Sequence, residues 1–149
     1  KKASVEIEEE IRSEINNGLL VFVGISKSDT HSDIEYVVDK VINLRVFPDN
    51  NGKFHFSLKD SKDELMVISQ FTLYGDTRKG RRPSFSDSME PVSAEKLFNE
   101  VVDMFKAHSG LEVKQGQFGS HMNVQLINDG PVTIWLDSED RRLPRNTIS

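Results

Sequence analysis

Alternating polar and apolar positions at the start of the chain predict a sheet. Residues 4–7 and 11–15 alternate in this way, as strands with one buried face do. The unbroken apolar run at 19–25 is typical of a more deeply buried strand. We expect further strands at residues 45–47, 53–58, 65–68, 113–116, 123–127 and 132–136.

Two segments have the period of an amphipathic helix. Thr30 followed by Asp33 resembles a capping box, and we expect a helix from there to about Leu44. A second helix is expected between Ser93, as its N-cap, and Gly110. Because strands predominate around these two helices, the pattern predicts an α/β domain with a largely antiparallel sheet, flanked by two helices.

The length of 149 residues favours one domain, which we place at residues 1–138. The polar end of the chain, residues 139–149, carries three arginines without an apolar period, and we expect it to be disordered. The chain has no run of eighteen apolar residues and no apolar leader, which predicts a cytoplasmic protein without a membrane partner. The absence of cysteine excludes disulfides, thiolate nucleophiles and cysteine-ligated metals.

The charge distribution limits any nucleic-acid site to a small region. The net charge is −5 and the chain opens with a cluster of glutamates, so the whole protein does not attract RNA. One loop, residues 74–91, carries a concentrated basic stretch of Arg78, Lys79, Arg81 and Arg82. This stretch is either a solvated loop or a local contact for phosphates.

Two motifs carry the candidate chemistry. The first is Ser69-Gln70-Phe71-Thr72, which continues into Leu73-Tyr74-Gly75-Asp76, and the second is Asn128-Asp129-Gly130-Pro131-Val132-Thr133. In this order, the pair resembles the D-aminoacyl-tRNA deacylase family. The resemblance covers residues 1 to about 138 and implies a compact β-barrel-like domain that forms a homodimer. Family chains open with a short strand ahead of the position of Lys1, and we expect that strand to be absent here or removed.

The side chains near the first motif do not supply an evident nucleophile. The four histidines lie in separate sequence contexts, without the spacing of a Ser-His-Asp relay. A lone serine at a strand end, such as Ser69, is more often a hydrogen-bonding residue than a nucleophile. Thr72 is better placed, yet its hydroxyl needs a base that the sequence does not provide.

The resemblance assigns roles that the residues alone do not. It implies that main-chain amides around Ser69, Gln70, Phe71 and Thr72 line the pocket for the ester carbonyl, while the 2′-OH of the terminal ribose assists attack. It also implies that a cis Gly130-Pro131 element of one subunit enters the pocket of the other and excludes L-amino acids, although glycine escapes this filter. No metal or cofactor is expected.

Contacts with the tRNA follow from the same resemblance. The segment from Gln117 to Asn123 is similar to the family's Phe-Gly-x-x-Met segment, so Phe118 and Met122 are candidates to receive the terminal adenine. Packing in the core is an equal alternative for both. The basic stretch would then meet acceptor-stem phosphates without reading the sequence.

Three functions fit these motifs. The first is a proofreading hydrolase that cleaves D-aminoacyl-tRNA, and mischarged glycyl-tRNA, to free tRNA and the amino acid. The second is a non-catalytic RNA-binding module of the same fold. The third is a related deacylase for an L-amino acid. The intact motif from Asn128 to Thr133 favours the D-selective enzyme.

Overall fold

The computed structural model describes residues 1–143, whose strands form three sheets. The first is antiparallel, in the order β2 (Glu10–Ile15), β1 (Lys2–Ile7), β8 (Asn123–Ile127). The second is parallel, in the order β3 (Gly18–Val23), β6 (Glu64–Ser69), β7 (Val113–Gln115). The third is a small antiparallel pair of β4 (Phe47–Pro48) and β5 (Phe54–Phe56). The α/β class is thus confirmed, with two sheets antiparallel and the sheet next to the helices parallel.

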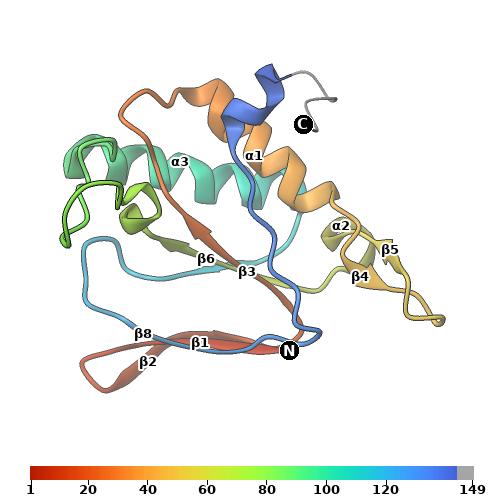
Figure 1. Cartoon of the computed structure of the whole chain (residues 1–149). Helices are drawn as coiled ribbons and strands as arrows, with labels where there is room; N and C mark the ends of the chain where they lie inside the picture. Colours follow the sequence, from red (N-terminus) through yellow and green to blue (C-terminus); the bar gives the residue numbers. More distant parts are fainter. Residues whose placement is uncertain (144–149) are drawn as a thin grey trace.

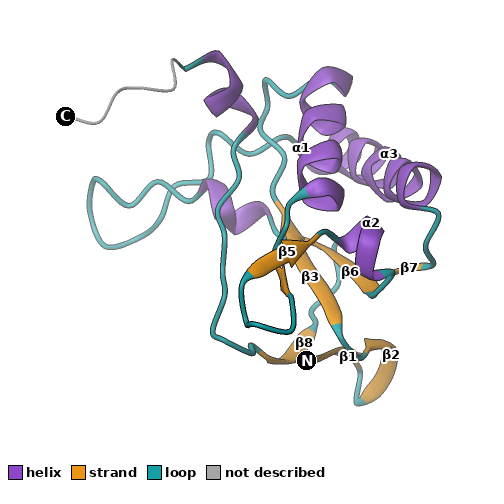
Figure 2. Ribbon diagram, turned by 90° about the vertical axis from the view of Figure 1, so that its right-hand side faces the viewer, coloured by secondary structure: helices purple, strands orange, loops and turns teal. Residues whose placement is uncertain are grey.

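Two long helices, α1 (His31–Asn43) and α3 (Pro91–Ser109), cover one face of the parallel sheet, and the antiparallel sheet of β1, β2 and β8 lies across its other face (Figure 1). The remaining helices are short: α2 (Leu58–Ser61) and two 3-10 turns, η1 (Phe71–Tyr74) and η2 (Ser138–Arg142). Figure 2 shows the same three layers after a quarter turn. Within residues 1–143, no helix has the length and apolar character needed to cross a membrane.

Strand β6 is the centre of the core because it is buried on both faces. Leu65 and Val67 belong to the cluster that packs against the helices, whereas Met66 and Ile68 belong to the cluster that packs against β1. Successive side chains of a strand point to opposite faces, which explains this division. A strand covered on both sides has a continuous apolar sequence, as residues 65–68 do.

The two long helices follow the sequence expectations with one correction, whereas the short helix α2 was not expected and begins at Leu58, the last residue of the predicted strand 53–58. The Asp33 carboxylate accepts hydrogen bonds from the Thr30 amide at 2.9 Å and the Thr30 hydroxyl at 2.7 Å, which confirms the predicted start of α1. The second helix begins two residues before the predicted cap Ser93. Glu90 is its N-cap and accepts from the amides of the first turn, and Pro91 occupies the first helical position, where its missing N–H costs nothing.

The predicted strand at residues 132–136 does not form. The segment runs from β8 to η2 in front of β3 (Figure 1), and an apolar groove of about 780 Å³ is lined by both this segment and β3. A strand needs a neighbour for its ladder hydrogen bonds. In the described part of the chain β3 is an edge strand that pairs with β6 alone, so residues 132–136 have strand-like side chains without a ladder partner.

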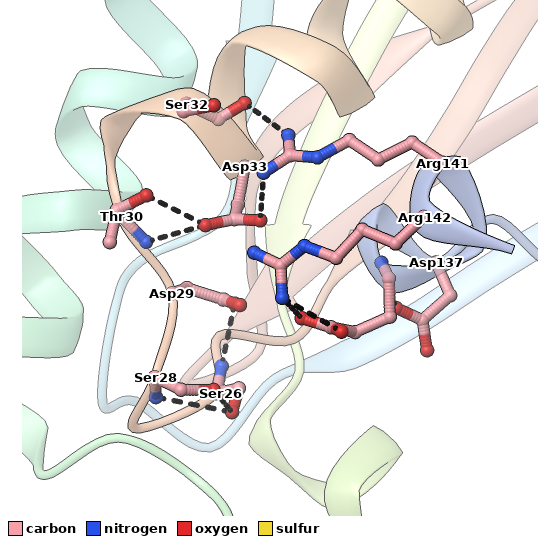
Figure 3. A network of polar contacts seen from close by, with 10 residues as sticks. Ser26, Ser28, Asp29, Thr30, Ser32, Asp33, Asp137, Arg141 and Arg142 are labelled. Carbon is pink, nitrogen blue, oxygen red and sulfur yellow. Dashed lines mark hydrogen bonds and ion pairs between the residues drawn. The ribbon is translucent and has the colours of Figure 1, made fainter.

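The expectation of a disordered end does not hold for residues 139–142, which belong to η2. This turn is fastened to the start of α1 by Arg141, whose Nη2 lies 2.9 Å from Asp33 Oδ1 and whose Nη1 donates to the Ser32 carbonyl at 2.7 Å (Figure 3). Residues 144–149 of the predicted disordered segment lie outside the described residues.

Candidate active site

Three segments meet where the parallel strands end. Because β3, β6 and β7 run in the same direction, the residues that follow them emerge at one edge of the sheet. The Gln70 amide donates to the Val23 carbonyl at 2.7 Å, and the Gly116 amide donates to the Val67 carbonyl at 3.1 Å, so these segments are held together. In α/β proteins, ligands bind outside the carboxyl ends of parallel strands. This edge is therefore the candidate site.

The first motif forms the centre of this edge. Ser69 is the half-buried last residue of β6, and the chain then turns through η1. The Leu73 amide donates to the Gln70 carbonyl at 3.3 Å, which closes the first 3-10 turn. The first N–H groups of a helix have no partner inside it. At η1 these are the main-chain amides of Phe71 and Thr72, both in exposed residues.

The hydroxyl groups of the motif are not joined to a base. Thr72 Oγ1 accepts from the side-chain amide of Gln70. Among residues 1–143, no hydrogen bond connects Ser69 or Thr72 to a histidine or a carboxylate. Burial, followed by the charges of Asp29 and other nearby carboxylates, raises the pKa of Tyr74 to about 12, so its hydroxyl stays protonated at neutral pH. The site thus offers backbone donors and no evident general base.

A glycine allows η1 to lie against the end of β3. A Cβ added to Gly24 would lie 3.1 Å from Leu73 Cβ and 3.2 Å from the Gln70 carbonyl oxygen, which is tighter than ordinary contact. On the other side, the Ser88 hydroxyl donates to the Phe71 carbonyl at 3.0 Å. The rings of Phe71 and Phe85 also meet edge to face at 5.0 Å. The backbone of η1 is thus fixed from both flanks.

Phe118 and Met122 lie beside this edge and also contact the core. The Phe118 ring is half-buried, 6.0 Å from the Phe98 ring of α3. Met122 packs against the cluster between the two larger sheets, and its sulfur lies 3.4 Å from the Gln117 nitrogen. Both residues therefore make the packing contacts that the sequence left open, while neither is fully buried. Their contact with adenine stays a prediction.

The Gly130-Pro131 peptide bond is cis, as the resemblance implies. Both residues are exposed, in the turn that follows β8. Figure 1 shows this turn near the N-terminus at the base of the molecule, away from η1 at the side. Among residues 1–143 no hydrogen bond joins the two motifs, although Leu73 and Tyr74 of the first and Val132 and Thr133 of the second line the same groove.

The basic stretch lies in a loop that projects from the site. Backbone hydrogen bonds in both directions between Asp76 and Ser84, at 2.7 and 2.9 Å, close the loop. Arg78 is engaged with Asp76 through two hydrogen bonds of 2.8 and 2.7 Å. The hydrogen bonds from Arg78 lower the pKa of the Asp76 carboxyl to about 2. The other basic side chains of the stretch are exposed, at Lys79, Arg81 and Arg82.

Comparison with known proteins identifies the family of this fold. The family model described as D-Tyr-tRNA(Tyr) deacylase matches residues 1–137. The chain belongs to this family. Relatives named D-aminoacyl-tRNA deacylase include those of Thermosipho africanus, 53% identical over 93% of both chains, and Clostridium botulinum, 54% identical over 91% of both chains. The sequence-based assignment to the family, and with it the expectation of a hydrolase acting on aminoacyl-tRNA, is confirmed.

Two solved structures resemble the fold of this chain. A protein titled c-Myc DNA Unwinding Element Binding Protein has a TM-score of 0.84 and 40% identity, covering 89% of this chain and 90% of that one. A probable eukaryotic D-amino acid tRNA deacylase has a TM-score of 0.72 over 83% of this chain and 87% of that one. At 13% identity, the second likeness supports the fold alone.

Sequence reasoning missed Gly24 and Ser88, which hold the backbone of the first motif, and it named Asn128 within the second motif without assigning a role to its side chain. A glycine directly after an all-apolar strand is a signal for a close backbone approach, and Gly24 could have been found in this way. Asn128 belongs to the second motif, and an asparagine two residues before a Gly-Pro turn is a signal for a side-chain hydrogen bond to the turn. Nothing in the sequence distinguishes Ser88 from neighbouring serines.

Proposed function

We propose that the protein cleaves the ester bond between a D-amino acid and the 3′ end of tRNA. The observation that carries this proposal is the pair of amides of Phe71 and Thr72, two exposed residues that open η1 at the edge where the parallel strands end. Relatives more than 50% identical over nine-tenths of the chain are named for this reaction. An ester hydrolase needs donors aimed at the developing oxyanion, and these amides are suitable donors.

The proposed reaction uses the backbone and the substrate. The ester carbonyl oxygen accepts hydrogen bonds from the amides of Phe71 and Thr72, and a water molecule adds to the carbonyl carbon. Collapse of the tetrahedral intermediate breaks the bond to the ribose oxygen, and the proton released by the attacking water reaches this oxygen through the neighbouring hydroxyl of the ribose. The products are the free amino acid and tRNA. One oxyanion donor contributes roughly 3–4 kcal/mol in other hydrolases.

Chirality is tested by the cis Gly130-Pro131 element. Its exposure leaves two consecutive carbonyls free to meet the substrate amino group and to obstruct an L side chain. Because the element lies away from η1 of its own chain (Figure 1), we propose that it serves the pocket of a second copy in a two-fold homodimer. Glycine has no side chain to obstruct, so glycyl-tRNA is also a substrate.

The acceptor end of the tRNA has two further contacts in this proposal. Phe118 and Met122 hold the terminal adenine at the edge beside Ser69. The phosphates of the acceptor stem meet Lys79, Arg81 and Arg82, whereas Arg78 is bound to Asp76 and mainly orders the loop. A proofreading enzyme of this kind works where tRNA is charged, which places it in the cytoplasm.

The rates of deacylation of D-tyrosyl-tRNA and L-tyrosyl-tRNA test the proposal. We expect rapid release of D-tyrosine and slow release of L-tyrosine, with the difference reduced by Pro131→Ala. Release of L-tyrosine alone would favour the L-selective alternative.

Retained tRNA binding without release of either amino acid would favour the non-catalytic alternative. That alternative has one specific support, because the solved relative at 40% identity is titled a DNA-binding protein. A filter-binding assay on the same preparations distinguishes this outcome from an inactive, misfolded protein.

A further inference from the structure

The turn that carries Gly130 and Pro131 has few internal hydrogen bonds. Residues 128–133 are all exposed, and among the described residues no backbone-to-backbone hydrogen bond involves any of them. An exposed segment without such bonds samples many conformations unless side chains fix it. A chiral filter that depends on the direction of two carbonyls requires a single conformation of the turn. Because backbone hydrogen bonds do not fix this conformation, side-chain contacts must do so.

The Asn128 side chain spans the turn. Its Oδ1 accepts from the Val132 amide at 3.0 Å, and its Nδ2 donates to Thr133 Oγ1 at 2.9 Å. A carboxamide can accept and donate at the same time, which a hydroxyl or a methyl group at this position could not do with the same reach. The two hydrogen bonds join residue 128 to residues 132 and 133, so Gly130 and Pro131 lie in the sequence between the joined positions.

Gly130 depends on the position of Val132. It has a φ of 130°, a conformation available to glycine and strained for other residues. A Cβ at Gly130 would lie 2.8 Å from Val132 Cγ2 and 3.1 Å from the Val132 nitrogen, so the backbone of the turn closes tightly on this residue. The hydrogen bond that the Val132 amide donates to Asn128 Oδ1 therefore holds Val132 in the position where it contacts Gly130.

We propose that Asn128 is a positioning residue that sets the direction of the Gly130 and Pro131 carbonyls and so determines how strongly L-aminoacyl esters are rejected. The inference rests on the proposed function and goes beyond it, because Asn128 itself does not touch the substrate. Asp129 provides the contrast within the same turn. Its contact with Lys1 Nζ is 3.5 Å long, with side chains 61% exposed for Lys1 and 62% exposed for Asp129, and such surface pairs contribute little.

The test compares Asn128→Ala, Asn128→Asp and Asp129→Ala with the wild-type protein. In Asn128→Asp, the introduced carboxylate can accept both from the Val132 amide and from the Thr133 hydroxyl, so this variant retains the two contacts. The readouts are the ratio of D-tyrosyl to L-tyrosyl release rates and the exchange of the Val132 amide hydrogen. The second readout reports the hydrogen bond without depending on activity.

We expect Asn128→Ala to lower the D-to-L ratio by about tenfold, as the loss of its two hydrogen bonds to the turn allows, and to speed exchange of the Val132 amide by a similar factor. Asn128→Asp and Asp129→Ala should stay within about threefold of the wild type. An unchanged D-to-L ratio for Asn128→Ala, or an equal decrease of this ratio for Asp129→Ala, would overturn the role of Asn128 and leave the proposed function standing. A wild-type protein that releases both amino acids equally would overturn the proposed function and the role of Asn128 together.

Discussion

Removal of the Arg141 side chain should destabilise the protein although Arg141 lies beyond the residues matched by the family model. The guanidinium loses an ion pair with Asp33 at 2.9 Å, a hydrogen bond to the Ser32 carbonyl at 2.7 Å and a position 5.6 Å from the Tyr36 ring. The Asp33 side chain is 6% exposed and that of Arg141 is 23% exposed. The pair is therefore buried on the carboxylate side and partly screened on the arginine side.

The expected loss of unfolding free energy depends on the hydrogen bonds that Asp33 keeps after the substitution. Breaking a fully buried ion pair by removing one partner costs about 3–5 kcal/mol. In Arg141→Ala, Asp33 keeps the amide and hydroxyl of Thr30 as donors. Because the Arg141 side chain is also partly solvated in the wild type, we expect the free energy of unfolding to fall by about 2 kcal/mol. Asp33→Ala also removes the carboxylate half of the capping box with Thr30, worth about 1 kcal/mol, for a total loss of about 3 kcal/mol.

Urea unfolding at pH 7 measures these losses, and thermal unfolding should show a decrease in Tm of about 4–8 °C for Arg141→Ala. The matched control is Arg142→Ala. Its pair with Glu139 has side chains 60% and 57% exposed, so the expected loss is below about 0.5 kcal/mol. Equal stability of Arg141→Ala and Arg142→Ala would refute the reasoning.

The pH dependence of the same loss is a second check. Burial acts to raise the pKa of the Asp33 carboxyl, but hydrogen bonds from Thr30 and Ser138 and the charge of Arg141 together hold this pKa below its ordinary value. A carboxyl with a lowered pKa stabilises the fold above its unfolded-state pKa, and this stabilisation is lost as the pH falls through the folded-state pKa. The difference between wild type and Arg141→Ala should thus be full at pH 7 and shrink below about pH 4.

Three further predictions concern the core, the site and the loop. Phe105→Ala should lower the free energy of unfolding in urea by about 3–5 kcal/mol, because the ring is fully buried, and a loss below about 1 kcal/mol would contradict its place in the core. Gly24→Ala should slow D-tyrosyl-tRNA deacylation at least about tenfold, because the added Cβ displaces η1, and an unchanged kcat would mean that η1 tolerates the shift. The double variant Arg81→Ala, Arg82→Ala should weaken tRNA binding and reduce its logarithmic salt slope by about 2, with an unaltered slope excluding these phosphate contacts.

Periodicity predicted the individual helices and strands because the spacing of apolar residues within a segment shows which of its faces is buried. The helix over 31–43 and the strands β1, β2 and β6 are of this kind. Pairing is not local. The parallel arrangement of β3, β6 and β7 depends on the two helical connections between them, and the failure of residues 132–136 to form a strand depends on what lies beside them.

The candidate site likewise contains residues that the sequence could identify and residues that only the fold brings together. Residues of the first motif are contiguous, so a sequence motif could identify them. Gly24 and Ser88 lie far from η1 in the sequence, one before it and one after it. Each acts through its close approach to the backbone of η1, which only the folded structure shows. The end of the chain shows a related effect, because Arg141 has an ordered position through a carboxylate 108 residues earlier in the sequence.

The layered core gives the two motifs a fixed spacing within each chain. The first motif continues β6, the turn with Gly130 continues β8, and β8 is joined to β1 through a regular ladder. Met66 and Ile68 of β6 pack with Val5 of β1 in one fully buried cluster, so the two larger sheets cannot slide independently. In the proposed two-fold dimer, this rigid spacing means that insertion of one turn into a partner's pocket brings the partner's turn into the reciprocal pocket. Substitutions that loosen this cluster, such as Met66→Ala, would then weaken chiral selectivity at both sites, although the cluster lies in neither.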